Sequence, residues 1–119
     1  MSGLSPEEFG RAIERELEEL RRAFSEVDLV PDPDLGVITL LVRVRGVLVK
    51  VILDQASWPE HRPLVRVAEP QWFHPHILDE KFLGIGSLDG WNRTMQLADV
   101  LREIETSFID SPPQRSLSI

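Results

Sequence analysis

Two neighbouring segments rich in β-branched residues, residues 37–45 and 47–54, constrain the fold more than any other part of this chain. Only Gly46 separates them, so we expect a tight antiparallel hairpin. Alternate side chains of a strand point to opposite faces. One face is wholly apolar and consists of Ile38, Leu40, Val42, Val44, Val47, Val49, Val51 and Leu53. The other face mixes Thr39, Arg43 and Lys50 with Val37, Leu41, Leu48 and Ile52.

An N-terminal helix over residues 5–24 has the strongest local signals. Ser5 is placed as the N-cap, Pro6 as the first helical residue, and Glu8 closes a capping box. Leu4 and Phe9 are placed for a hydrophobic staple. A sheet with apolar residues on both faces is either covered on both or keeps a patch for a partner, and we expect this helix to provide the cover. Its apolar stripe consists of Phe9, Ile13, Leu17, Leu20 and Phe24.

A second helix is predicted over residues 94–108, where apolar residues recur at helical spacing. Short strands are predicted at residues 27–30 and 64–68. The order of elements predicts an α+β two-layer domain with an N-terminal helix, a four-stranded antiparallel meander, a long apolar loop and a C-terminal helix. We expect one domain over residues 1–119, with residues 114–119 as a flexible tail.

The composition excludes several classes of function. The formal net charge is −7 and no basic run is longer than Arg21 and Arg22, which argues against a nucleic-acid binder. The absence of cysteine excludes disulfides, cysteine-based metal sites and thiol catalysis. No apolar stretch approaches the roughly 20 residues of a membrane span, and the N-terminal residues lack the apolar region of a signal peptide. We therefore expect a cytoplasmic protein without membrane insertion and without a cofactor.

Residues 71–91 are rich in apolar side chains but follow neither a helical nor an alternating period, which predicts a loop laid over a core. His74 and His76 flank a proline, and the residue before a proline favours extended geometry. Together with His61 they suggest a metal site, but no fourth ligand accompanies them, and a structural His74 that pins the loop is favoured. No base accompanies the carboxylates that would serve in hydrolysis, which are Asp79, Glu80 and Asp89.

The order of these elements resembles the ubiquitin-conjugating enzyme fold over nearly the whole chain. Residues 58–63, W-P-E-H-R-P, look like the aromatic-Pro-x-x-x-Pro turn before the fourth strand of that superfamily, which includes RWD domains. Residues 73–77, F-H-P-H-I, are similar to its F-H-P-N-I signature. Leu88, Trp91 and the second helix fall where the family has its L…W and following helix. These motifs in this order imply a UBC-like two-layer fold.

Two departures from the family pattern bear on function. In conjugating enzymes a cysteine lies ten residues after the signature histidine, where this chain has Gly84. The signature asparagine, which helps to stabilise the oxyanion, is replaced by His76. A thioester needs a thiolate, and a nucleophile at Ser87 would give a far less reactive oxyester. The resemblance therefore implies a chain that is not an enzyme, with His74, His76 and Gly84 at a vestigial active site.

The chain looks most like the cysteine-less ubiquitin-conjugating enzyme variants, the UEV family. Residues 77–91 and 108–113 are similar to the UEV domains of ESCRT sorting subunits. The resemblance implies binding of ubiquitin, a ubiquitin-like protein or a Pro-rich peptide of a partner protein. Gly46 leaves almost no extended hairpin tongue, an element that ESCRT-type UEVs use on ubiquitin, so an RWD-like assembly domain without a ubiquitin role is the alternative. The candidate binding residues are Phe82, Leu83, Ile85 and Ser87 near the vestigial site, and Val37, Leu41, Leu48 and Ile52 on the sheet.

Overall fold

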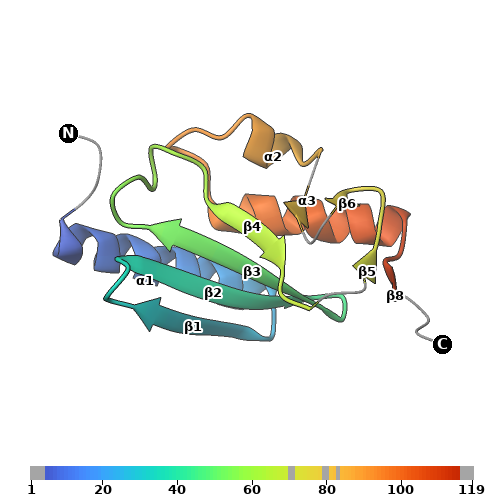
Figure 1. The fold of residues 1–119 in the computed structure, drawn as a ribbon, viewed down its shortest axis with the longest axis horizontal. Coiled ribbons are helices and arrows are strands. Elements are labelled where there is room, and N and C mark those ends of the chain that lie inside the picture. The colour runs from blue at the N-terminus through green and yellow to red at the C-terminus, as the bar shows by residue number, and fades with distance from the viewer. Residues whose placement is uncertain (1–4, 70–71, 79–80, 83, 116–119) are drawn as a thin grey trace.

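The computed structural model describes residues 5–69, 72–78, 81–82 and 84–115, and Figure 1 shows how their elements are arranged. The helices are α1 (Pro6–Ala23), α2 (Gly86–Asp89) and α3 (Leu97–Asp110). The strands are β1 (Val27–Asp32), β2 (Val37–Val44), β3 (Val47–Asp54), β4 (Leu64–Val67), β5 (Trp72–Phe73), β6 (Ile77–Leu78), β7 (Lys81–Phe82) and β8 (Gln114–Arg115).

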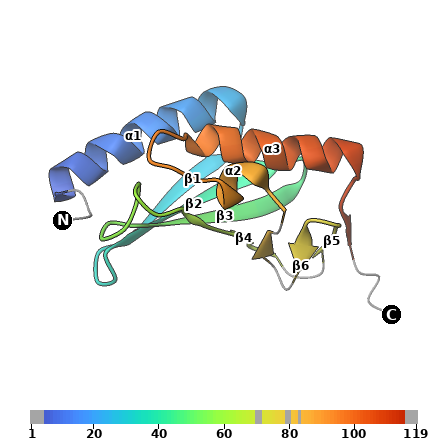
Figure 2. The same cartoon turned by 90° about the horizontal axis from the view of Figure 1, so that it is seen from above.

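A helical layer and a sheet layer make up the fold, which confirms the predicted α+β architecture. Within the described residues the large sheet is antiparallel and has the order β1-β2-β3-β4-β7-β6, while β5 pairs with β8. Figure 2 shows α1 and α3 on the same face of the large sheet. The apolar strand face packs beneath them. Its fully buried members are Leu40, Val42, Val44, Val47, Val49, Val51 and Leu53.

The opposite face of the sheet, called the outer face below, has no helix over it in the described part of the chain (Figure 2). Its apolar residues Val37, Leu41, Leu48 and Ile52 are half-buried. The expectation that the N-terminal helix covers this face is wrong, because α1 packs beside α3 on the other one. Among the residues that the structure describes, the outer face is therefore open.

Helix α1 begins where the capping box predicts. The Glu8 N–H donates to Ser5 Oγ at 3.2 Å, and the Ser5 N–H donates to the Glu8 carboxylate at 3.2 Å. Phe9 and Leu20 of the predicted stripe are buried in the hydrophobic core, where the Phe9 ring lies 6.0 Å from that of Trp58. The proposed staple partner Leu4 lies outside the described residues. The helix therefore forms from local signals that tertiary packing reinforces.

A two-residue turn, Arg45 and Gly46, joins β2 to β3. Both residues have positive φ, 46° and 88°, as the tight hairpin turns that favour glycine require. Val44 lies directly opposite Val47. The hairpin therefore has no extended tongue, as its sequence predicts.

Residues 71–91 hold more regular structure than predicted, since β5, β6, β7 and α2 lie within them. These elements have two or four residues each, too few to establish a period. Helix α3 starts later than the predicted residue 94, because Asn92 Oδ1 accepts the Thr94 N–H at 2.9 Å and holds a turn there. Gln114 and Arg115, predicted as flexible tail, instead pair with β5, and the other tail residues lie outside the described part.

Candidate functional site

His74 fixes the segment after β5 to helix α3. Its Nε2 lies 3.0 Å from the carbonyl oxygen of Ser107, and its Nδ1 lies 3.0 Å from the backbone nitrogen of His76. A carbonyl oxygen only accepts and a backbone N–H only donates, so Nε2 carries the proton. The ring is 9% exposed and meets Phe108 edge-on, with the centroids 5.0 Å apart. This geometry agrees with a structural His74, and the described residues contain no group of three or more side chains suited to a metal ion.

His76 occupies the space beside Gly84, the position that the family resemblance assigns to the cysteine. Gly84 has a φ of 71°, a region that glycine enters freely and other residues rarely adopt. A Cβ added to Gly84 would lie 2.8 Å from Nδ1 of His76 and 3.1 Å from its Cε1. The rings of His74 and His76 lie 5.6 Å apart, so the three predicted vestigial residues do come together. The imidazole of His76 therefore stands where any side chain on residue 84 would begin.

Glu103 on α3, which the sequence did not single out, holds the start of α2. Its carboxylate accepts the N–H groups of Gly86 at 2.5 Å and Ser87 at 2.9 Å. Helix α2 has no side-chain cap of its own, so Glu103 satisfies N–H groups that the helix leaves unpaired. Partial burial acts to raise the pKa of Glu103, but the hydrogen bonds from Ser87 and Gly86 outweigh it, and the pKa falls below its ordinary value of 4.5.

Two of the predicted loop candidates lie in the core. Phe82 is 8% exposed and Ile85 is 1% exposed, and the Phe82 ring lies 6.1 Å from that of Phe108. Although both are candidate binding residues, their side chains are not available at the surface, because their segment packs against α3. Ser87 is half-buried and its N–H is taken by Glu103, while Leu83 lies outside the described residues.

The outer face brings the predicted sheet candidates together and extends beyond them. Leu64 pairs with Ile52 across β3 and β4 and is 45% exposed. Leu78, in the edge strand β6, is 60% exposed. The sequence did not identify these two leucines as surface residues, because each lies in or beside a short strand without a clear period. All four predicted sheet residues share the face, namely Val37, Leu41, Leu48 and Ile52.

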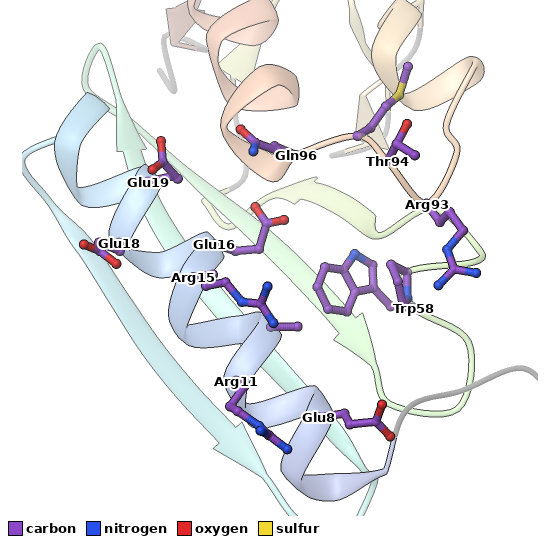
Figure 3. Close-up of a pocket in the computed structure, with 13 residues that line it drawn as sticks. Glu8, Arg11, Arg15, Glu16, Glu18, Glu19, Trp58, Arg93, Thr94 and Gln96 are labelled. Carbon is purple, nitrogen blue, oxygen red and sulfur yellow. The ribbon is translucent and has the colours of Figure 1, made fainter.

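A pocket of about 670 Å³ lies between α1 and the residues before α3 (Figure 3). Neither His76 and Gly84 nor the residues of the outer face line it. On its α1 side, the Glu16 carboxylate accepts the N–H of Leu97, the first residue of α3, at 3.0 Å. Burial raises the pKa of Glu16, and the nearby Asp99 and Glu19 raise it further, although the Leu97 hydrogen bond opposes them. Trp58 also lines the pocket, and at 3% exposure it belongs to the hydrophobic core. The pocket therefore lies at the joint where α1 holds the start of α3.

Glu16→Gln and Glu103→Gln are expected to change the free energy of unfolding in opposite directions at neutral pH. Folding raises the pKa of Glu16, so its charged form is disfavoured in the fold, and glutamine keeps an acceptor for Leu97 without that penalty. Folding lowers the pKa of Glu103, so its charged form stabilises the fold above the ordinary value of 4.5. We expect Glu103→Gln to lose roughly 1 kcal/mol, since hydrogen bonds to charged groups are the stronger ones.

Urea unfolding of both variants across a range of pH checks this prediction. The gain of Glu16→Gln should fade as the pH falls through the raised pKa of Glu16 towards 4.5, and the deficit of Glu103→Gln should narrow as the pH falls below 4.5. Glu105→Gln, on the same helix as Glu103 and half-buried, is the matched control. Equal effects of Glu16→Gln and Glu103→Gln at neutral pH would contradict the two assignments.

Comparison with known proteins bears on the fold. No protein-family model matches this sequence, and no curated protein matches it. Among solved structures, the chain is similar to the ubiquitin-conjugating enzyme E2 UbcA1 from Agrocybe aegerita, with a TM-score of 0.61 and 16% sequence identity. The superposition covers 89% of this chain and 84% of that one. At this identity the likeness shows the fold alone, and that fold is the one which the motifs around Trp58 and His74 imply. The chain therefore has the ubiquitin-conjugating-enzyme-like fold.

Proposed function

We propose that this chain is a non-catalytic domain of the UEV type, which binds ubiquitin or a ubiquitin-like protein without a covalent bond. Because it has no cysteine, the chain cannot form a thioester. The observation that carries the proposal is that the His76 ring fills the space beside Gly84. A catalytic side chain on residue 84 would have to begin in that space. A conjugating-enzyme-like fold without a nucleophile keeps its surfaces for binding other proteins. Binding is therefore the role that this fold retains.

The open outer face supports a binding role. Contiguous apolar patches that stay exposed on soluble domains mark interaction sites. Leu41, Leu48 and Ile52 are half-buried with no described helix over them, and Leu64 and Leu78 are exposed on the same face. A single interface made by these few side chains would bury a small area of surface. We therefore expect a dissociation constant roughly in the micromolar range.

A titration of isotope-labelled protein with ubiquitin, followed by NMR, tests this function. We expect ubiquitin to shift the amide signals of Leu41 and Ile52, and Leu41→Asp to weaken binding about tenfold or more, because it would bury a carboxylate in an apolar interface. Leu35→Asp is the matched control, since Leu35 is 72% exposed in the turn between β1 and β2. Absence of any shift at millimolar ubiquitin would rule the proposal out.

An RWD-like assembly domain without a ubiquitin role is the second candidate. The two-residue turn at Arg45 and Gly46 favours it, since the resemblance implies an extended hairpin tongue for ESCRT-type contacts to ubiquitin. This candidate becomes the better account if ubiquitin shifts no residue and the outer face nevertheless binds another protein.

A groove beside β5 and β8 favours Pro-rich peptides as a further ligand class of the same domain. The groove has a volume of about 620 Å³, and Phe73, Pro75 and Pro112 are among the residues that line it. Phe73 is 61% exposed, and aromatic grooves are typical sites for extended Pro-rich segments. In the same NMR titration, a Pro-rich peptide is expected to shift Phe73 and Gln114 rather than the outer face.

A further inference from the structure

Three cations stand side by side on the outer face of the sheet. The strand register places Lys50 of β3 opposite Arg66 of β4, and Arg66 opposite Lys81 of β7. Lys50 and Lys81 are the two lysines of the whole chain. Neighbouring strands lie roughly 5 Å apart, so this basic row spans about 10 Å across the sheet.

The basic row is unfavourable for the isolated fold. Like charges directly opposite each other on neighbouring strands destabilise a sheet. The chain has 20 carboxylate residues, yet no described carboxylate forms an ion pair with any member of the row. Arg43 on the same face is different, because it pairs with Glu26 at 3.2 Å and Glu69 at 3.3 Å.

Arg66, at the centre of the basic row, also lacks one side-chain hydrogen bond within the described part of the chain. Its Nε atom is enclosed and has no hydrogen-bond partner among the described residues. Buried polar atoms in folded proteins nearly always have a partner, so an exception calls for an explanation. A local arrangement that costs stability without a gain inside the chain is typical of a functional surface.

Apolar side chains flank the basic row on both sides. In the register, Leu41 lies opposite Lys50 at one end, and the 60% exposed Leu78 lies opposite Lys81 at the other. Phosphate groups do not need such flanking leucines, and the net charge of −7 disfavours nucleic acid. A partner surface complementary to this one would carry carboxylates between apolar groups.

We propose that the partner which docks on the outer face is a protein segment that presents carboxylate side chains flanked by apolar ones. The carboxylates lie against Lys50, Arg66 and Lys81, and the apolar groups against Leu41 and Leu78. This inference rests on the proposed binding role of the same face and adds the chemistry of the partner. It also explains why the row is tolerated, since a bound acidic segment removes the repulsion.

Two short peptides, used as probes in an NMR titration of the full chain, test the proposal. One carries glutamates between two leucines and the other carries lysines in the same positions. We expect the glutamate peptide alone to shift the amides of Lys50, Arg66 and Lys81, with an effect that weakens as salt is added. Lys50→Glu combined with Lys81→Glu should weaken this binding about tenfold or more. Arg11→Glu combined with Arg102→Glu, two exposed cations of the helical layer, should leave it unchanged.

A second measurement needs no ligand. Lys50→Glu turns one like-charge pair into an opposite-charge pair with Arg66, so the urea midpoint of unfolding should rise. A lower midpoint would overturn the proposal, because it would mean that the basic row is already compensated within the chain. Concentration-dependent shifts of the row in the protein alone would assign the face to a second copy and would also overturn it.

Failure of this inference can be told apart from failure of the proposed function. If ubiquitin shifts the outer face but the glutamate peptide does not, and the double reversal leaves ubiquitin binding unchanged, the binding role stands and the acidic partner is wrong. If the glutamate peptide binds and ubiquitin does not, the acidic partner stands and the ubiquitin role is wrong.

Discussion

Replacing His74 with alanine is expected to lower the free energy of unfolding by roughly 3 kcal/mol. The ring is 9% exposed, donates to the Ser107 carbonyl and accepts the His76 N–H. Its loss would leave that N–H without an acceptor and a gap beside Phe108, whose ring it meets at 5.0 Å. A buried unsatisfied group and a cavity each destabilise a fold, so the two effects should add.

Urea denaturation at neutral pH measures this change. His61→Ala is the control, because His61 is exposed in the turn between β3 and β4, and its backbone N–H, which the substitution keeps, donates to the Ser57 carbonyl at 2.9 Å. Exposed substitutions of this kind usually change stability by less than about 0.5 kcal/mol. Similar losses for both variants would mean that His74 does not hold residues 74–77 against α3.

The helices and long strands could be predicted because their signals are local. Ser5 and Glu8 are three residues apart, and the capping box needs only that spacing and a helical stripe behind it. The alternation in residues 37–54 determines which side chains of β2 and β3 face the core, and Gly46 accounts for the turn. Such patterns are visible without knowledge of the partner surface.

The candidate site could be predicted only in part, because its contacts join distant segments. Glu103 binds the N–H of Gly86 from 17 residues away, and no spacing rule connects a helical glutamate with a loop glycine. Phe82 and Ile85 have no period, so their burial depends on how residues 81–85 pack against α3. His74 and Gly84 could be placed, since the motif around them has a known order and spacing.

The basic row shows a different limit of sequence patterns. Lys50, Arg66 and Lys81 are separated by 16 and 15 residues, and only the strand register makes them neighbours. In the sequence, each of these three residues looks like a single charged side chain on the solvent side of a strand. A one-residue change of register would send each side chain to the other face, so the cluster exists only in the folded sheet.

The unmodified chain is expected to form no thiol-sensitive adduct with ubiquitin. Incubation with an activating enzyme, ATP and tagged ubiquitin checks this, since the chain has no cysteine and has Gly84 where the resemblance to conjugating enzymes places one. An active conjugating enzyme in the same reaction is the positive control. A covalent adduct on the unmodified chain would refute the non-catalytic assignment.

Gly84→Cys would add the missing thiol but is expected to cost about 2 kcal/mol of stability. The residue has a φ of 71°, and its new Cβ would lie 2.8 Å from the His76 ring, which would have to move. His76→Asn removes that ring and supplies the residue that the family signature has there. The double variant should therefore lose less stability than the two single changes together, by at least about 0.5 kcal/mol, in a double-mutant cycle measured by urea unfolding. Strict additivity would mean that the His76 ring does not obstruct a side chain on residue 84. Adduct formation by Gly84→Cys as well as by the double variant, but not by the unmodified chain or by His76→Asn, would show that the missing nucleophile alone separates this fold from thioester chemistry.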